Sequence, residues 1–295
     1  MDLIATFGLP VLISAVIAYL LGSISFAIPV TRLFTGKDIR TMGSGNAGFT
    51  NVLRCVSIPA AVITFIGDFA KGICSVFIGE LVFNLMCGNV PDIEHVAQVG
   101  AGVAGLFALL GHLFPLYFGF KGGKGVLISA GIICALDWRS FLSLVVIFLI
   151  ALAITKTVSK CSLTVAVCYP IITLLFNRMV YDSSAWLPMT LIAVCFAAVV
   201  IYMHRANIRR ILDGTEPKTI ARKKGAPEPP RDPDGKKERE SADNDGNAQG
   251  NAQGNAQDNA QNETANEPEA EGSADSDGKT SDNAEGGKKK KKKLR

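Results

Sequence analysis

The sequence predicts an all-α integral membrane protein, and three observations support this fold class. Long apolar runs recur over residues 1–220, and short polar segments separate them. Several of these segments are rich in glycine, asparagine and basic residues, and irregular backbone of that kind is not found exposed to lipid. Basic residues also concentrate on alternate polar segments, which is typical of a chain that crosses a membrane repeatedly.

Seven apolar runs are expected to form the transmembrane helices. In chain order they are Leu3–Val30, Ile58–Met86, Val96–Phe118, Val126–Leu136, Phe141–Ile154, Leu163–Phe176 and Trp186–Met203. The first is interpreted as a retained helix, because it lacks a basic start and a cleavage site and is too long for a signal peptide. A complete span needs roughly 20 apolar residues, so the fourth and fifth runs are short. The alternative is five spans plus a re-entrant hairpin made of these two runs.

The distribution of basic residues predicts an outer N-terminus and a cytoplasmic C-terminus. With the N-terminus outside, Arg139 and Arg178 are the basic residues near the spans on the outer side. The inner side then holds Arg32, Lys37, Arg40, Arg54, Lys121, Lys124, Lys156, Lys160, Arg205, Arg209 and Arg210. Because cytoplasmic loops carry the excess of lysine and arginine, every glycine-rich loop is expected to face the cytoplasm.

Residues 1–220 are predicted to form one membrane domain, and residues 221–295 a disordered cytoplasmic tail. The tail nearly lacks aromatic and β-branched residues, repeats Asn-Ala-Gln-Gly, and ends in a run of lysines at 288–293. Such a composition cannot bury enough apolar surface to offset the entropy of ordering. The tail is expected to be accessory, the alternative being that its lysines contact anionic lipid headgroups.

Composition argues against a disulfide framework and against a metal centre. The 7 cysteines are scattered, mostly within apolar runs, and the 3 histidines do not cluster at metal-binding spacing. Free cysteines in such runs behave as small hydrophobic side chains. We therefore expect no metal, no other cofactor, no nucleic-acid partner and no obligate protein partner.

The most unusual polar stretch is Gly43-Ser-Gly-Asn-Ala-Gly-Phe-Thr-Asn51, which lies between the first two spans. Its glycines permit tight turns, and backbone N–H groups in such turns can bind an anion. Arg40 precedes the stretch and Arg54 follows it. We call residues 37–54 the first loop and predict that it binds a phosphate group.

Two further segments share this chemistry. The second loop is Lys121-Gly-Gly-Lys-Gly125, and the third segment is His204-x-x-Asn-Ile-x-Arg210 followed by Gly214-Thr-Glu216. Charged donors bind phosphate oxygens strongly, and glycines let the backbone approach closely. The second loop is not a Walker A motif, because glycine rather than serine or threonine follows Lys124. Together the three segments favour phosphate ligands at more than one site, and they do not indicate a nucleotide.

Ionisable residues inside the apolar runs are further candidates. Asp68 and Lys71 lie three residues apart and so share a helix face. Such residues are costly at membrane depth and indicate function, although a structural ion pair is equally open. His112 is expected to be a hydrogen bonder in helix packing. His204 has Asn207 and Arg210 at helical spacing, so it is the better candidate for a general base.

These motifs resemble the bacterial acyl-phosphate:glycerol-3-phosphate acyltransferases of the PlsY type. The resemblance covers Tyr19 to Lys218. Besides the three segments above, it rests on Leu21-Gly-Ser-Ile24, Gly36-Lys-Asp-Ile-Arg40, Asp68-x-x-Lys-Gly72 and Gly111-His-x-Phe-Pro115. It implies transfer of a fatty acyl group from acyl phosphate to the 1-hydroxyl of sn-glycerol 3-phosphate. The products would be lysophosphatidic acid and phosphate, in the first step of phospholipid synthesis, at the cytoplasmic face of a bacterial cell membrane.

The resemblance also implies roles for individual residues and no metal requirement. Expected catalytic residues are His204, Asn207, Lys124 and Ser44. Expected phosphate-binding residues are Gly45, Asn46, Asn51, Arg54, Arg40, Lys121, Gly122, Gly123, Gly125, Ser159, Arg210 and Glu216. Phe49 stands where the family usually has alanine, and it is expected to affect chain-length preference or loop packing.

An acyl phosphate is already activated, so positioning and charge stabilisation are the expected tasks of the enzyme. The chain has no His-x4-Asp box and no G-x-S-x-G elbow, and direct attack without an acyl-enzyme is expected. Two proton acceptors stay open, His204 and a substrate phosphate oxygen. A transporter of phosphorylated metabolites is the alternative function, disfavoured because the charges gather at one face and no inverted repeat is visible. A membrane-anchored protein that recruits partners through its tail is the other alternative.

Overall fold

The computed structural model describes residues 3–181 and 183–217, and this part of the chain is helical. Its α-helices are α1 (Leu3–Gly22), α2 (Ala27–Thr35), α3 (Phe49–Cys55), α4 (Ile58–Cys87), α5 (Ile93–Leu113), α6 (Val126–Leu136), α7 (Trp138–Thr155), α8 (Val158–Leu175), α9 (Trp186–Met203) and α10 (Arg205–Leu212). Short 3₁₀ turns, η1 (Ile39–Thr41) and η2 (Leu116–Phe118), and a π-helical turn, η3 (Phe176–Val180), complete the described elements. The all-α prediction is confirmed here, whereas the predicted tail, residues 221–295, lies outside the described residues.

Six segments of the described chain are long and apolar enough to cross a membrane. They are Thr6–Thr35, Ile58–Cys87, Ile93–Phe118, Trp138–Thr155, Val158–Val180 and Trp186–Met203. Helix α6 has 11 residues and is therefore about 16 Å long, roughly half the thickness of a hydrocarbon core. A multi-pass architecture is thus supported, while the predicted count of seven spans is not confirmed.

The first apolar run, predicted as one helix over Leu3–Val30, is broken in the structure. Helix α1 ends at Gly22, and α2 begins only at Ala27. Lys71 from α4 lies at the break, where its Nζ donates to the carbonyl oxygens of Gly22 at 3.0 Å and Ile24 at 2.5 Å. A helix inside a membrane can break where another residue satisfies the freed carbonyls. The prediction of an unbroken helix was wrong because that partner comes from a distant part of the chain.

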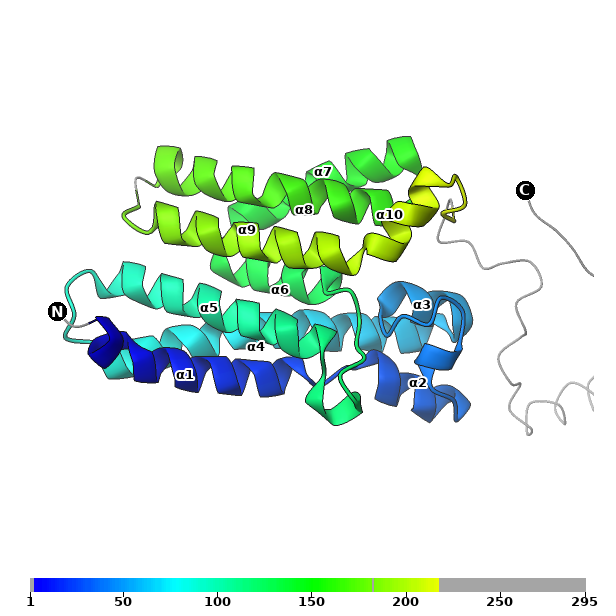
Figure 1. Ribbon diagram of the computed structural model, residues 1–295, viewed down its shortest axis with the longest axis horizontal. Helices are drawn as coiled ribbons and strands as arrows, with labels where there is room; N and C mark the ends of the chain where they lie inside the picture. Colours follow the sequence, from blue (N-terminus) through cyan, green and yellow to red (C-terminus); the bar gives the residue numbers. More distant parts are fainter. Residues whose placement is uncertain (1–2, 182, 218–295) are drawn as a thin grey trace, which may run out of the picture. The chain divides into compact units, whose positions relative to one another are not determined.

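The helices pack in two groups. Helices α1, α4, α5 and α6 pack against one another, while α7, α8 and α9 form a second group, joined to the first by α5–α9 and α6–α7 contacts (Figure 1). Glycines permit the close approaches within the first group. A Cβ atom on Gly22 would lie 2.1 Å from the Ala108 carbonyl oxygen, and one on Gly131 would lie 2.1 Å from that of Phe69. The helices that carry the polar loops are therefore closely packed against one another.

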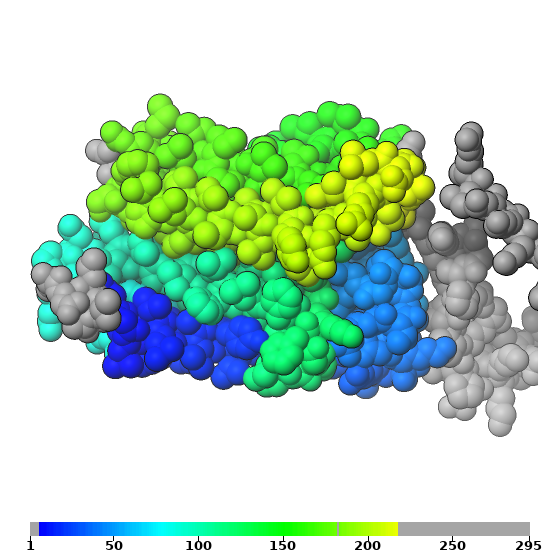
Figure 2. Space-filling view, in the orientation of Figure 1, coloured from blue at the N-terminus to red at the C-terminus, as the bar shows by residue number. Residues whose placement is uncertain are grey.

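The polar loops predicted to bind phosphate gather at one end of the bundle. Helices α2, α3 and α10 lie at that end (Figure 1), and Figure 2 shows the surface of α10, in yellow, directly beside that of the first loop and α3, in blue. The first loop joins α2 to α4, and the second loop joins α5 to α6. The first loop and the third segment, which are separated by about 150 residues in sequence, thus lie at the same end of the bundle.

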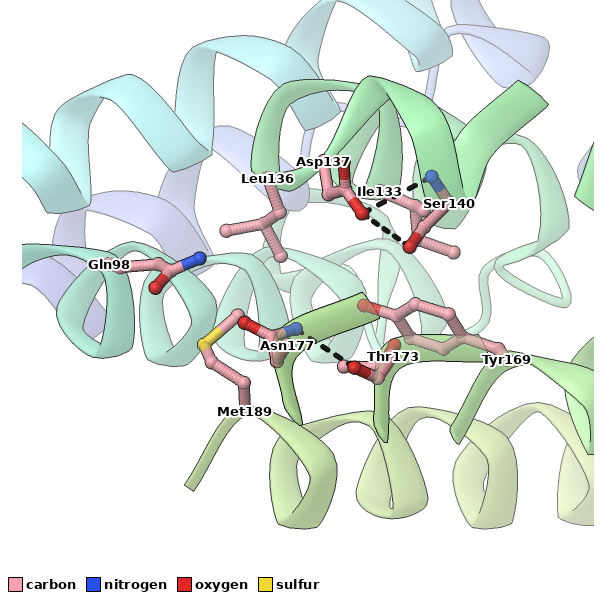
Figure 3. A pocket seen from close by; sticks show the side chains of 9 residues that line it. All are labelled: Gln98, Ile133, Leu136, Asp137, Ser140, Tyr169, Thr173, Asn177 and Met189. Atoms are coloured by element: carbon pink, nitrogen blue, oxygen red, sulfur yellow. Dashed lines mark hydrogen bonds between the residues drawn. The ribbon is translucent and has the colours of Figure 1, made fainter. Parts of the chain in front are cut away.

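A small cavity lies at the opposite end of the bundle, between α5, the α6–α7 turn and α8 (Figure 3). It encloses about 10 Å³ and is lined by Gln98, Ile133, Leu136, Asp137, Ser140, Tyr169, Thr173, Asn177 and Met189. The Asp137 carboxylate accepts hydrogen bonds from the backbone N–H groups of Arg139 and Ser140, so it caps α7. None of the predicted site residues lines this cavity.

Candidate active site

The side chain of Asn51 holds the first loop in shape. It is 3% exposed, and its Nδ2 lies 3.2, 3.0 and 3.0 Å from the carbonyl oxygens of Ile39, Met42 and Asn46. Its Oδ1 accepts a hydrogen bond from the backbone N–H of Ser44 at 3.0 Å. Both the oxygen and the nitrogen of the Asn51 side-chain amide are therefore hydrogen-bonded to the backbone of the loop. Asn51 lies inside the loop as its organiser, not on the surface that faces solvent.

The exposed side of the first loop is formed by Ser44 and Gly45, with Asn46 half-buried beside them. Gly43 and Gly45 have φ angles of 54° and 71°, a left-handed conformation that costs glycine little. A Cβ atom on Gly43 would lie 2.5 Å from Asn51 Oδ1. Glycine is therefore needed there for both conformation and space, and Ser44 is left free to meet a ligand.

Arg40 joins the first loop to the second. Its Nη1 donates to the carbonyl oxygens of Phe118 at 2.6 Å and Lys121 at 3.2 Å. Asp38 holds the other side of the guanidinium, through Nε at 3.0 Å and Nη2 at 2.9 Å. Hydrogen bonding to Arg40 keeps the pKa of Asp38 well below its usual range. The structure therefore places Arg40 as a tether between loops, and Asp38 is a partner that sequence reasoning missed.

The glycines of the second loop fit against the end of α5. The backbone N–H groups of Gly122 and Gly123 donate to the carbonyl oxygens of Leu113 at 3.1 Å and His112 at 3.3 Å. A Cβ atom on Gly122 would lie 2.0 Å from the His112 oxygen, and one on Gly123 would lie 2.6 Å from that of Ala47. Close packing thus explains these two glycines without any ligand.

Gly125 ends the second loop with a φ angle of 83° and directly precedes α6. It is buried, whereas Lys121 is exposed and Lys124 half-buried. The loop therefore turns tightly between two helices and leaves its two lysines as the groups able to meet an anion.

The third segment forms a hydrogen-bonded network with Ser159 at the start of α8. Asn207 Nδ2 donates to Ser159 Oγ at 2.8 Å and to Glu216 Oε1 at 2.7 Å. Ser159 Oγ also donates to Glu216 Oε1 at 2.5 Å. On the other carboxylate oxygen, Glu216 accepts from Arg210 Nε at 2.7 Å. The network fixes four of the predicted site residues relative to one another.

Two acceptor atoms near this network have no hydrogen-bond partner among the described residues. Asn207 is 2% exposed, and its buried Oδ1 accepts no hydrogen bond there. His204 lies at the junction of α9 and α10, with Nδ1 2.8 Å from the Val200 carbonyl oxygen. A carbonyl can only accept, so Nδ1 carries the proton and Nε2 keeps its lone pair. These two atoms can receive a hydrogen bond from a ligand hydroxyl.

Lys124 lies within electrostatic reach of all three segments. The pKa of its ammonium group is lowered to about 8, mainly by burial and also by the positive charges of Arg210 and Arg54, with Glu216 opposing the shift. Close-set cations of this kind repel one another unless an anion lies between them. The arrangement suits a doubly charged phosphate.

Burial also lowers the pKa of His204 below its usual range, and the charge of Lys124 adds to this effect, while the Val200 hydrogen bond and Glu216 oppose it. His204 is therefore neutral at pH 7. For Glu216, burial alone would raise the pKa, but the hydrogen bonds from Ser159, Asn207 and Arg210 outweigh it and lower the value. Glu216 is therefore an anion that organises its neighbours.

The structure brings together most of the residues predicted for the site. Arg54 and Arg210 influence Lys124 electrostatically, His204 is influenced by Lys124 and Glu216, and Asn207 and Ser159 bind Glu216. Asn51, Arg40, Gly122 and Gly123 support the loops from within. Among the residues that the structure describes, no group of three or more histidine, cysteine or acidic side chains is arranged to hold a metal ion.

Comparisons with known proteins show the family of the chain. A profile of the glycerol-3-phosphate acyltransferase family matches residues 12–214. A glycerol-3-phosphate acyltransferase of Clostridioides difficile is 41% identical over 217 residues, which cover 72% of this chain and 97% of the relative. One of Bacillus subtilis is 37% identical over 203 residues, 69% of this chain and 94% of the relative.

Solved structures agree as well. The crystal structure of PlsY, an integral membrane glycerol 3-phosphate acyltransferase, in its glycerol 3-phosphate form is 31% identical with a TM-score of 0.59, covering 70% of this chain and 94% of that one. Its lysophosphatidic acid form is 30% identical with a TM-score of 0.58 and the same coverage. The multi-pass membrane acyltransferase expected from the sequence is thereby confirmed, and the chain belongs to the glycerol-3-phosphate acyltransferase family.

Proposed function

We propose that the protein transfers a fatty acyl group from acyl phosphate to the 1-hydroxyl of sn-glycerol 3-phosphate at the cytoplasmic membrane face. The observation that carries this proposal is the pairing of free acceptors with clustered cations. Asn207 Oδ1 and His204 Nε2 accept no hydrogen bond from the described residues, and Lys124 lies close enough to influence His204. A substrate that carries both a hydroxyl and a phosphate matches this pairing.

The cations exceed the anions in the proposed site. Lys124, Arg54 and Arg210 contribute positive charge, and Glu216 is engaged by Arg210 at 2.7 Å. Charged donors bind phosphate oxygens through short, strong hydrogen bonds. Two phosphate groups, one from each substrate, would use this excess charge, with Ser44 and the exposed backbone of the first loop as additional donors.

The reaction requires few chemical devices. The glycerol 1-hydroxyl oxygen attacks the acyl carbonyl carbon, a new C–O ester bond forms, and the bond from that carbon to the phosphate oxygen breaks. The hydroxyl proton passes to His204 Nε2 or to a substrate phosphate oxygen, and phosphate leaves. Lys124 stabilises the negative charge that develops on the departing phosphate. No acyl-enzyme is formed, and the acyl tail extends into lipid.

The choice of donor is tested with purified protein and labelled glycerol 3-phosphate, offered acyl phosphate, acyl-CoA and acylated carrier protein in separate reactions. The expected result is lysophosphatidic acid from acyl phosphate alone. Product from acyl-CoA or acyl carrier protein at a comparable rate would contradict the proposed donor. Trapping of a covalent acyl-protein during turnover would contradict direct attack.

The cytoplasmic location is supported by the excess of basic residues on the loops of the site. A fusion of a fluorescent protein after residue 217 tests it, because such proteins fluoresce on the cytoplasmic side, whereas a periplasmic phosphatase fused at the same position is active only outside. The expected pair is bright fluorescence with inactive phosphatase. The reverse pair would contradict the orientation.

A further inference from the structure

Three ionisable side chains that the proposed reaction does not use meet inside the bundle. Asp68 and Lys71 come from α4 and His112 from α5, and they are 1%, 3% and 3% exposed. Lys71 Nζ lies 2.8 Å from Asp68 Oδ1 and 3.0 Å from His112 Nδ1, and His112 Nδ1 lies 3.6 Å from Asp68 Oδ1. We call these three residues the buried triad. Ionisable residues inside a membrane domain pair with one another or with backbone carbonyls.

The triad is joined to the break between α1 and α2. Lys71 Nζ donates to the carbonyl oxygens of Gly22 and Ile24 at 3.0 and 2.5 Å, and it lies 6.0 Å from the centre of the Phe26 ring. Helix α2, which starts just beyond the break, leads directly into the first loop. The ammonium group of Lys71 therefore holds the backbone at the α1–α2 break, the end of the segment that leads into the first loop.

The triad is joined equally closely to the second loop. The backbone N–H of Gly123 donates to the carbonyl oxygen of His112 at 3.3 Å. A Cβ atom on Gly123 would lie 2.3 Å from His112 Nε2 and 2.6 Å from the carbonyl oxygen of Ala47. The His112 ring, the second loop and the first loop thus meet at one point, one residue before Lys124.

The two ring nitrogens of His112 face different parts of this junction. Nδ1 lies 3.0 Å from Lys71 Nζ, and Nε2 is the nitrogen that faces Gly123. Asp68 balances the charge of Lys71. In the described structure no hydrogen bond or ion pair joins the three side chains to Lys124, His204 or the Glu216 network, so we expect any effect on the reaction to pass through the loops.

We propose that the buried triad is a positioning device that sets the separation of the first and second loops, with Lys71 as the main positioning residue for the phosphate groups of the substrates. Lys71 anchors the base of the first loop, and His112 supports the backbone beside Lys124. This inference rests on the proposed function, because the ligand that reports on loop separation is glycerol 3-phosphate. A purely structural triad would support the fold without tuning the affinity for that ligand.

The test compares Lys71→Met, Lys71→Arg and Asp68→Asn with a matched control, Ser75→Ala. Ser75 lies one turn further along α4, is buried, and hydrogen-bonds only to the Lys71 backbone oxygen of its own helix in the described structure. Binding of glycerol 3-phosphate is measured by calorimetry, its KM and kcat by turnover, and folding by thermal unfolding, all in the same detergent.

The expected result is a rise of at least tenfold in both the dissociation constant and the KM for glycerol 3-phosphate in folded Lys71→Met. Lys71→Arg recovers part of this loss, because a guanidinium can still donate to the two carbonyl oxygens, and Ser75→Ala stays within twofold of the parent protein. Unchanged binding and KM in folded Lys71→Met would overturn the proposal.

If Lys71→Met does not fold, the decision passes to His112→Asn, which keeps an acceptor for Lys71 but removes the part of the ring against Gly123. A KM at least five times the parent value supports the proposal, and a parent-like KM overturns it. Failure of the parent protein to turn over with any donor, while it still binds glycerol 3-phosphate, would contradict the proposed function and leave the triad to be judged by binding alone.

Discussion

The first loop and the third segment each contain a buried asparagine, and the two are used in opposite ways. Asn51 has both ends of its amide bound to loop backbone. Asn207 donates to Ser159 and Glu216 but leaves Oδ1 without a partner among the described residues. A buried polar atom without a partner is costly, so it persists in a site that a ligand completes.

The difference distinguishes a residue that shapes its own loop, Asn51, from a residue that leaves an acceptor atom available to a ligand, Asn207. In the first loop, the buried Asn51 side chain bonds to the loop's own backbone, and Ser44 and Gly45 are exposed to solvent. The third segment presents unused acceptors beside Lys124. A family motif rich in Asn, Gly and Arg therefore contains residues of both kinds, and only their hydrogen-bond partners tell them apart.

The largest effect is expected from Asn51→Ala. The substitution strands several buried backbone groups at a cost of about 1–3 kcal/mol each, so we expect the free energy of unfolding to fall by about 3 kcal/mol and kcat/KM by more than about 100-fold. Thermal unfolding and turnover measure the two quantities. Thr41→Ala, on the exposed rim of the same loop, is the control and should change little. A stable but inactive Asn51→Ala would mean that Asn51 binds substrate instead.

Asn207→Ala should separate activity from stability. We expect kcat/KM to fall by about 100-fold, because the acceptor for the substrate hydroxyl is lost, while the free energy of unfolding falls by only about 1 kcal/mol. Ser162→Ala, a buried serine of α8 bonded to its own helix, is the control. Equal losses of activity and stability in Asn207→Ala would remove the contrast with Asn51.

A smaller effect concerns pH and the two titrating groups of the site. The kcat/KM should rise with pH through the lowered pKa of His204, because Nε2 must be unprotonated, and fall through the pKa of Lys124 near 8, because its ammonium group must be charged. In Lys124→Arg the falling limb near pH 8 should disappear, since arginine stays protonated. The exposed Lys121 provides the control Lys121→Arg, which should keep that limb. Its persistence in Lys124→Arg would assign it to another group.

The smallest effect is expected from removing residues 222–295. The third segment ends at Glu216 and the described residues end at 217, and the tail composition predicts disorder. We expect turnover in reconstituted vesicles within twofold of the full chain. A loss of acyl transfer of tenfold or more would show that the tail is not accessory and would favour a role for its lysines at the membrane.

Sequence reasoning predicted which candidate residues gather at one end of the bundle better than it predicted their contacts. Periodic apolar runs and charged loops were enough to predict the helices and to group Lys124, Arg210 and Glu216, because both signals are local. The role of Arg40 as a tether could not be predicted, since its partners Phe118 and Lys121 lie about 80 residues away. For the same reason the triad was anticipated only as a pair, Asp68 with Lys71, with His112 considered separately.

The sequence by itself determined that this chain enters a membrane, and it indicated which polar segments carry the basic residues proposed to bind phosphate. Hydropathy and charge are properties of each segment alone, so they can be read without a fold. Only the tertiary structure decided that the first helix breaks at residues 23–26, and that both ends of the Asn51 amide are bonded while Asn207 Oδ1 is left without a partner among the described residues. It also decided that Lys71 joins this break to Asp68 and His112. These features depend on hydrogen bonds between distant segments, and such bonds exist only once the helices have packed.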